Sequence, residues 1–248
     1  ARLAELDAAF DGALINALAN DEFKAKAGSS ASYPSFGKIA AGRLLIVGLG
    51  EGDAMAVQQA AGAAGKAARA SGADSVALDM GGLDAAQSQI AVEGFIAGNY
   101  KFDKYKTAKD KKSGASQLTL LGGADATGVG RGEAVSGGQS LARDLVNEPA
   151  DAIYPQSLAD VALGLASDQL TVEVWDDTKI EAEGMGGIMG VGRGSERKPR
   201  FIHMKYTPKG TPTRKIALVG KGVTFDAGGY SMKPSAGMQT MRCDMAGS

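Results

Sequence analysis

Four charged residues near the end of the sequence combine side-chain types that could do metal or acid–base chemistry. Lys221, Asp226, Lys233 and Asp244 supply two carboxylates and two amines on a glycine-rich stretch. Carboxylate oxygens suit hard divalent cations. On charge content alone, the same residues also fit surface charges on an ordinary connection between elements. The residue types by themselves leave both a metal site and a solvated loop open.

The position of these residues along the chain favours a site. The apolar run Lys215–Gly220 is predicted to be a strand, and polar residues cluster directly after it. In open α/β sheets, ligands bind beyond the carboxyl ends of the strands. We therefore expect the chemistry of this chain to lie in the segment that follows residue 220.

The histidine and cysteine content gives little support for a nucleophilic site in place of the charged segment. His203 is the sole histidine and lies in a predicted strand, so a serine or cysteine nucleophile would have to use it as its base. A structural role for His203 fits better. Cys243 is the sole cysteine and has no recognisable partner motif, which favours a small buried side chain over a nucleophile.

Three glycine-rich turns resemble nucleotide-binding loops but depart from them. The turn over residues 48–52 follows a strand and precedes a helix, yet its third glycine comes one residue too early for the dinucleotide fingerprint. The turns over residues 190–195 and 220–222 lack the Gly-Lys-Ser/Thr ending of a phosphate loop. A nucleotide hydrolase is therefore disfavoured, and a nucleotide-binding module remains only a weak alternative.

Apolar periodicity predicts alternating strands and helices along most of the chain. Strands are expected at Arg43–Gly48, Ser75–Asp79, Ser116–Leu121, Leu170–Trp175, Ile188–Val191, Arg200–Tyr206 and Lys215–Gly220. Helices are expected at Asp53–Ser71, Asp84–Gly98, Glu133–Val146, Pro155–Ala166 and Thr178–Glu183. This alternation indicates an α/β fold with a mostly parallel sheet that carries helices on both faces.

The chain length and one proline indicate two domains. At 248 residues the chain exceeds the usual size of a single domain. The predicted helix before Asn147-Glu-Pro149 must end there, because proline disfavours its continuation. We therefore predict an N-terminal α/β domain over residues 1–150 and a second α/β unit over residues 151–248.

Composition bounds the partners and the compartment. The 27 Lys and Arg nearly balance the 28 Asp and Glu, so the net charge of −1 implies no nucleic-acid partner. The basic stretch Lys101–Ser113 is predicted to be a solvated loop. A single cysteine excludes an internal disulfide and fits the cytoplasm or an organelle matrix, such as that of a plastid or mitochondrion. No apolar run suits a membrane span or a signal peptide.

The segment after residue 219 has a recognisable pattern. GKGVTFDAGGYSMKPSAGMQTMRCDMAG closely resembles the signature of the leucine aminopeptidase family, and LARDLVNEPADAIYP and FDKYKT fit segments upstream. The resemblance extends over most of the chain. It implies that residues 151–248 are the first part of a metallopeptidase catalytic domain, which is incomplete in this chain.

The resemblance also implies site residues. It assigns Lys221 to one metal ion, Asp226 to a bridge between two ions, and Asp244 to a further ligand position. Lys233 matches a charged lysine that stabilises the developing oxyanion, and Met241 matches a residue that lines the pocket for the substrate's N-terminal side chain. Lys221 can bind a metal only when neutral, so the cation must displace its proton.

The implied activity is hydrolysis of the first peptide bond of a leucine-type substrate with a free N-terminus, by water that two divalent ions activate. Zinc or manganese is expected, with magnesium as an alternative, in a homohexamer with no membrane partner. Ala227 and Gln239 depart from the usual serine and aspartate without removing a ligand. The family's Asn-Thr-Asp-Ala-Glu-Gly-Arg ligand motif would lie beyond Ser248. We therefore expect this chain alone to bind metal weakly and to be inactive.

The sequence leaves one further reading of function open. A truncated homologue without activity can serve as a scaffold or an assembly subunit, because fold resemblance does not establish function. Metal-dependent release of leucine from a leucyl amide separates the two readings, since only the enzyme produces it.

Overall fold

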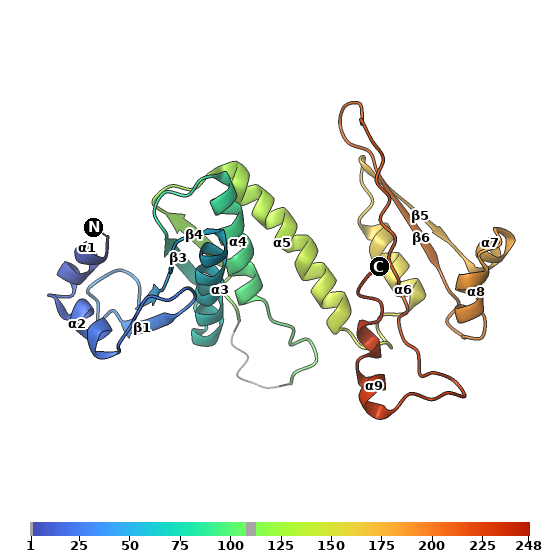
Figure 1. Ribbon diagram of the computed structural model, residues 1–248, viewed down its shortest axis with the longest axis horizontal. Helices are drawn as coiled ribbons and strands as arrows, with labels where there is room; N and C mark the ends of the chain where they lie inside the picture. The colour runs from blue at the N-terminus through green and yellow to red at the C-terminus, as the bar shows by residue number, and fades with distance from the viewer. Residues whose placement is uncertain (1, 108–112) are drawn as a thin grey trace. The chain divides into compact units, whose positions relative to one another are not determined.

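The computed structural model describes residues 2–107 and 113–248, which form two compact units (Figure 1). The first unit covers Ala1–Leu141 and the second covers Ala142–Ser248. The dividing point lies within one long helix, and the predicted domain boundary near residue 150 stays a prediction. Across the described residues, none of the helices combines the length and the apolar character needed to cross a lipid bilayer.

The first unit contains four helices, four strands and most of a fifth helix among its described residues. They follow the order α1 (Arg2–Ala9), α2 (Ala13–Asn20), β1 (Ser30–Pro34), β2 (Arg43–Val47), α3 (Ala54–Ser71), β3 (Ser75–Asp79), α4 (Ala85–Asn99), β4 (Gln117–Leu121) and α5 (Ala126–Asn147). Strands β3 and β4 pair in parallel from Ser75↔Gln117 to Asp79↔Leu121. Strands β1 and β2 pair antiparallel. The α/β class is therefore confirmed.

Acidic caps explain where α3 and α4 begin. The carboxylate of Asp53 accepts a hydrogen bond from the backbone N–H of Ala56 at 2.8 Å. Asp84 and Gln87 form a reciprocal capping box at the start of α4. Each cap satisfies backbone donors that have no partner inside the helix. These local signals are visible in the sequence, which is why both predicted helices agree with the structure to within about a residue.

The core of the first unit lies between α3, α4 and the neighbouring strands. Its buried members are Val57, Ala61, Ala64, Ala68, Ala91 and Phe95. Small residues let the two helices approach closely: a Cβ on Gly98 would lie 2.1 Å from the carbonyl oxygen of Gly62. Side chains of β2, β3 and β4 pack against this cluster, including Val47, Val76 and Leu118. Figure 1 shows α3 and α4 side by side against these strands.

Two features of the sheet differ from the expected mostly parallel, doubly covered arrangement. Within the part of the unit that the structure describes, only β3 and β4 are parallel, whereas the short connection between β1 and β2 makes that pair antiparallel. Exposure alternates along β3 and along β4, so helices cover one face of this pair. Polar side chains such as Ser75, Asp79 and Gln117 occupy the other face, which explains why it stays in water.

The second unit is built around one antiparallel strand pair. Its further elements are α6 (Pro155–Gly164), β5 (Leu170–Trp175), α7 (Asp177–Ala182), α8 (Gly186–Gly192), β6 (Phe201–Tyr206), α9 (Ser235–Gln239) and the 3-10 turn η1 (Met241–Cys243). Strands β5 and β6 pair from Leu170↔Tyr206 to Trp175↔Phe201. The rings of Trp175 and Phe201 lie 5.0 Å apart at the end of the pair, where they reinforce the register.

Two predicted strands of the second unit are wrong. Residues 188–191 lie inside α8, because a short apolar run cannot be assigned to a strand or to a helix by periodicity alone. The run Lys215–Gly220 forms neither helix nor strand and pairs with no other strand among the described residues. The predicted loop Lys101–Ser113 contains neither helix nor strand over residues 101–107, and residues 108–112 of this prediction lie outside the described residues.

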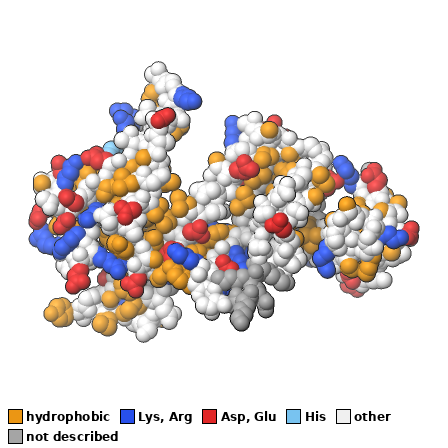
Figure 2. All heavy atoms as spheres, turned by 180° about the vertical axis from the view of Figure 1, so that it is seen from behind, with side chains coloured by type: hydrophobic (Ala, Val, Ile, Leu, Met, Phe, Trp, Pro, Cys, Tyr) orange, Lys and Arg blue, Asp and Glu red, His pale blue; other side chains and the backbone are white. Residues whose placement is uncertain are grey.

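The unpaired run leaves apolar side chains in water. Ile216, Leu218 and Val219 are 69%, 93% and 97% exposed. Figure 2 shows hydrophobic side chains spread over the visible surface of the second unit, in the left half of the picture. Apolar side chains that lie exposed along one run favour the packing of another segment or surface there.

Candidate metal centre

Glycines let the two ends of the segment 220–248 approach each other closely. A Cβ on Gly220 would lie 2.1 Å from the carbonyl oxygen of Gly247, and a Cβ on Gly222 would lie 3.1 Å from the Cβ of Ser248. A larger residue at position 220 would therefore separate the two stretches. The close approach places Lys221 beside Asp244, although 23 residues separate them in the sequence.

Lys221 contacts Asp244 in two ways. Its Nζ forms an ion pair with Oδ2 of Asp244 and donates to the backbone oxygen of Asp244 at 3.3 Å. The Asp244 side chain is 34% exposed and that of Lys221 is 60% exposed. This pair therefore lies at the surface and is open to solvent and to small ions.

A compact turn holds Asp226 against Lys233. The N–H of Gly228 donates to Oδ1 of Asp226 at 2.8 Å. The Nζ of Lys233 forms an ion pair with Oδ2 and donates to the backbone oxygen of Asp226 at 2.9 Å. The turn requires glycine at position 228, where φ is +90° and a Cβ would lie 2.3 Å from the Ser231 carbonyl oxygen.

The two pairs form one electrostatic cluster. The hydrogen bond from Lys233 is the main cause that holds the pKa of Asp226 below its usual value of 3.8. The Gly228 N–H and the positive charges of Lys233 and Lys221 lower this pKa further. The structure therefore forms two ion pairs among the four predicted charged residues, Lys221 with Asp244 and Lys233 with Asp226.

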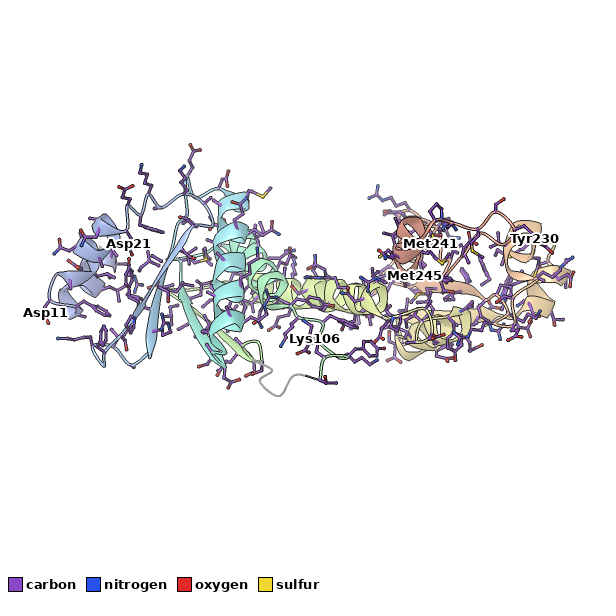
Figure 3. All side chains as sticks on the ribbon, turned by 90° about the horizontal axis from the view of Figure 1, so that it is seen from below. Asp11, Asp21, Lys106, Tyr230, Met241 and Met245 are labelled. Atoms are coloured by element: carbon purple, nitrogen blue, oxygen red, sulfur yellow. The ribbon has the colours of Figure 1, made fainter. Side chains whose placement is uncertain are left out.

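Met241 lies in the same region. It belongs to η1, is partly buried, and precedes Asp244 by three residues. Met245 is only 3% exposed and anchors the turn. In Figure 3 both methionines lie close together on the C-terminal segment, whereas Tyr230 lies well away from them. The predicted role of Met241 as a pocket residue stays a prediction.

The side chains present have the right atoms to bind a divalent cation, but they are too few to hold two ions. Asp226 and Asp244 offer carboxylate oxygens, and Lys221 offers a nitrogen that binds once its proton is lost. Among the described residues, no group of three or more His, Cys, Asp or Glu side chains is arranged to hold a metal ion. Two carboxylates are fewer than two ions need. The residues present therefore supply only part of a metal centre.

The other candidates of the sequence do not join this cluster. His203 is exposed on β6, with its Nδ1 4.0 Å from a carboxylate oxygen of Glu173. Cys243 is exposed, so the expectation that it is buried is wrong; the adjacent Arg242 of the short η1 turn is exposed as well. At the 48–52 turn, the carboxylate of Asp53 occupies the N-terminus of α3. A negative charge there disfavours a nucleotide phosphate.

The sequence interpretation missed the role of Gly228. Its N–H fixes one carboxylate oxygen of Asp226 and leaves the other oxygen to Lys233. The pattern Asp-Ala-Gly-Gly carries a signal for this contact, because aspartate side chains commonly accept a hydrogen bond from the backbone two residues ahead.

Sequence comparisons with known proteins all match one family. Residues 1–109 match the N-terminal domain of the cytosol aminopeptidase family, and residues 140–248 match the catalytic domain of that family. A protein of Synechococcus sp. named "Probable cytosol aminopeptidase" is 38% identical over 99% of the chain and 51% of its own length. One of Geobacter sp. with the same name is 38% identical over 98% of the chain and 52% of its own length.

Solved structures show the same similarity. A tomato leucine aminopeptidase mutant superposes with a TM-score of 0.81 at 29% identity, over 98% of this chain and 49% of that one. The bottromycin maturation enzyme BotP in complex with Mn superposes with a TM-score of 0.77 at 31% identity, over 93% of this chain and 50% of that one. The chain spans about half the length of the relatives it matches.

Proposed function

Because the chain belongs to the cytosol aminopeptidase family, we propose that it supplies part of the active site of a metal-dependent aminopeptidase that releases a leucine-type N-terminal residue from peptides. The observation that carries this proposal is the cluster of Lys221, Asp226, Lys233 and Asp244. The names of the relatives support the peptidase activity, and the tomato structure supports the leucine preference.

In this proposal Asp226 and Asp244 are metal ligands, and Lys221 becomes a ligand when a cation displaces its proton. Two divalent ions, zinc or manganese with magnesium as an alternative, would supply the Lewis acidity that polarises the scissile carbonyl and activates water. The manganese complex of BotP supports the use of a divalent metal. Met241 would line the pocket for the substrate's N-terminal side chain.

Lys233 would act on the substrate rather than on the metal. Its side chain is 29% exposed and its ammonium group pairs with Asp226, so it lies next to any cation that this aspartate binds. A positive charge in this place stabilises the oxyanion that develops on the carbonyl oxygen as the peptide bond is attacked. The carboxylate of Asp226 would orient Lys233 through their ion pair.

This chain holds only part of the proposed metal centre, which limits the activity of the chain alone. The described residues provide two carboxylates, so we propose that this chain by itself binds metal weakly and hydrolyses no peptide. The native protein would be a homohexamer in the cytoplasm or in an organelle matrix. The small donor set and the exposed apolar run also favour a second candidate, a non-catalytic scaffold or assembly subunit.

The test is metal-dependent release of leucine from leucyl amide by the native polypeptide that contains this chain. We expect release in the presence of Mn²⁺, and we expect Lys233→Ala to reduce kcat by about a hundredfold or more. Lys209→Ala is the matched control, because it removes an exposed lysine of the same unit. Release that persists in Lys233→Ala contradicts the assigned role, and no release from the unaltered polypeptide favours the scaffold.

A further inference from the structure

Arg242 lies between two residues of the candidate site, yet its side chain reaches away from them. It follows Met241 in η1 and precedes Asp244 by two residues. Its Nη1 donates to the backbone oxygen of Asn147 at 3.2 Å, although 95 residues separate the two in the sequence. Asn147 is the last residue of α5 and belongs to the same compact unit as Arg242.

The end of α5 is a favourable place for a cation. The last four carbonyl groups of an α-helix have no donor within the helix, and the helix dipole gives that end a partial negative charge. Helix α5 is 22 residues long, so this charge is fully developed. Arg242 both donates a hydrogen bond to this terminus and gains from its charge.

The chain beyond α5 is held firmly. The Nη1 of Arg197 donates to the backbone oxygen of Ala150 at 3.0 Å, and its guanidinium lies 4.4 Å from the centre of the Tyr154 ring. Ile153 is only 9% exposed, so the segment also has an apolar anchor. Arg242 therefore connects η1 to a fixed point of the unit.

The turn that carries Asp244 has two anchors besides Arg242: Met245, which is 3% exposed, and Lys221, whose Nζ contacts Asp244. The N–H groups of Cys243 and Asp244 donate to Thr240 and Met241 at 3.0 and 3.1 Å, which are contacts within the turn itself. We propose that Arg242 is a positioning residue: it fixes η1 on the C-terminal end of α5 and so holds Asp244 where it binds a divalent cation. This inference rests on the proposed function, because it takes Asp244 to be a metal ligand.

The proposal predicts a change in Mn²⁺ affinity opposite to the change that charge alone predicts. Removal of a positive charge near a cation site should tighten cation binding by Coulomb's law. If Arg242 positions Asp244, Arg242→Met instead weakens Mn²⁺ binding to the chain by about threefold, the size of effect that a charge at a helix terminus provides. Arg242→Lys should restore binding, because lysine also donates to a helix C-terminus.

Arg214→Met is the matched control in this titration, because it removes one exposed arginine of the same unit. We expect it to bind Mn²⁺ at least as tightly as the unaltered chain. Arg242→Met that binds Mn²⁺ as tightly as, or more tightly than, the unaltered chain overturns the proposal. An equal loss in Arg242→Lys also overturns it.

A second measurement separates this inference from the proposed function. Hydrogen exchange of the Cys243 and Asp244 amides in the metal-free chain should accelerate about threefold in Arg242→Met and return to the original rate in Arg242→Lys. If the unaltered chain binds no Mn²⁺, the proposed function fails and this exchange decides the positioning role alone. Unchanged exchange in Arg242→Met then rejects that role.

Discussion

The helix pair of the first unit and the charged segment of the second unit are held together in different ways. Helices α3 and α4 interlock through glycine and alanine, with Phe95 only 3% exposed. Lys221, Asp226 and Lys233 are held by ion pairs and backbone hydrogen bonds at the surface, beside a run with Val219 97% exposed. Stability is therefore concentrated in the first region, and chemistry in the second.

The largest effect should come from the helix pair. Phe95→Ala removes a buried aromatic ring and leaves a cavity, so we expect a loss of about 3–5 kcal/mol in the free energy of unfolding. The matched variant Phe225→Ala, at a site that is 46% exposed, should cost less than about 1 kcal/mol. Urea denaturation of both variants measures the difference. Equal losses would remove the contrast between the two regions.

A pair of glycines tests how tightly α3 and α4 pack. Gly98→Ala places a Cβ 2.1 Å from the Gly62 carbonyl oxygen, so we expect a loss of about 1–3 kcal/mol from overpacking. Gly138→Ala has open space within α5 and should stabilise by about 0.5–1 kcal/mol through helix propensity. Opposite signs in thermal unfolding support the packing account, whereas stabilisation by both variants refutes it.

In the second region the measurable effect is on protonation. The folded pKa of Asp226 lies below 3.8, because Lys233 and then the Gly228 N–H favour the carboxylate. Its contribution to stability is therefore complete above the unfolded pKa and is lost as the pH falls through the lower folded pKa. Lys233→Met should raise this pKa towards 3.8, as followed by NMR titration of the carboxyl group. No upward movement would show that the ion pair is absent in solution.

The smallest effect concerns a polar contact of the first unit. The hydroxyl of Tyr33 donates to Asp21 at 2.6 Å, and this hydrogen bond raises the pKa of Tyr33 to about 12. The contribution of this contact is present below pH 10 and is lost as the pH rises through the raised pKa. Asp21→Asn should return the absorbance titration of Tyr33 towards 10. If Asp21→Asn leaves the Tyr33 titration unchanged, this exposed contact is absent in solution, unlike the ion pair of Asp226 in the second region.

Local signals in the sequence predict much of the first unit. Asp53 and Asp84 mark the starts of α3 and α4, and alternating apolar residues mark β3 and β4. The pairing direction of β1 and β2 and the single covered face of β3–β4 depend on contacts between distant segments. A periodic pattern along one segment carries no information about its neighbours, so these features could not be predicted.

The second unit shows where sequence patterns fail. Residues 188–191 and 215–220 have similar apolar character, yet the first run is helical and the second forms neither helix nor strand. A family motif predicts the four charged site residues, and the structure forms two ion pairs among them. The contact of Arg242 with Asn147 joins residues 95 positions apart, and no local pattern indicates it.

The most direct test of the account is Mn²⁺ titration of the chain, with Asp226→Asn and Asp244→Asn compared against Asp168→Asn. Asp168 is an exposed aspartate of the same unit, so its variant controls for the loss of one negative charge. The account predicts that the unaltered chain binds Mn²⁺ weakly and that each site variant lowers the affinity by about tenfold or more, because each removes a direct ligand. Binding should persist in the Asp168→Asn control. Equal binding by all three variants would contradict a metal centre at this site.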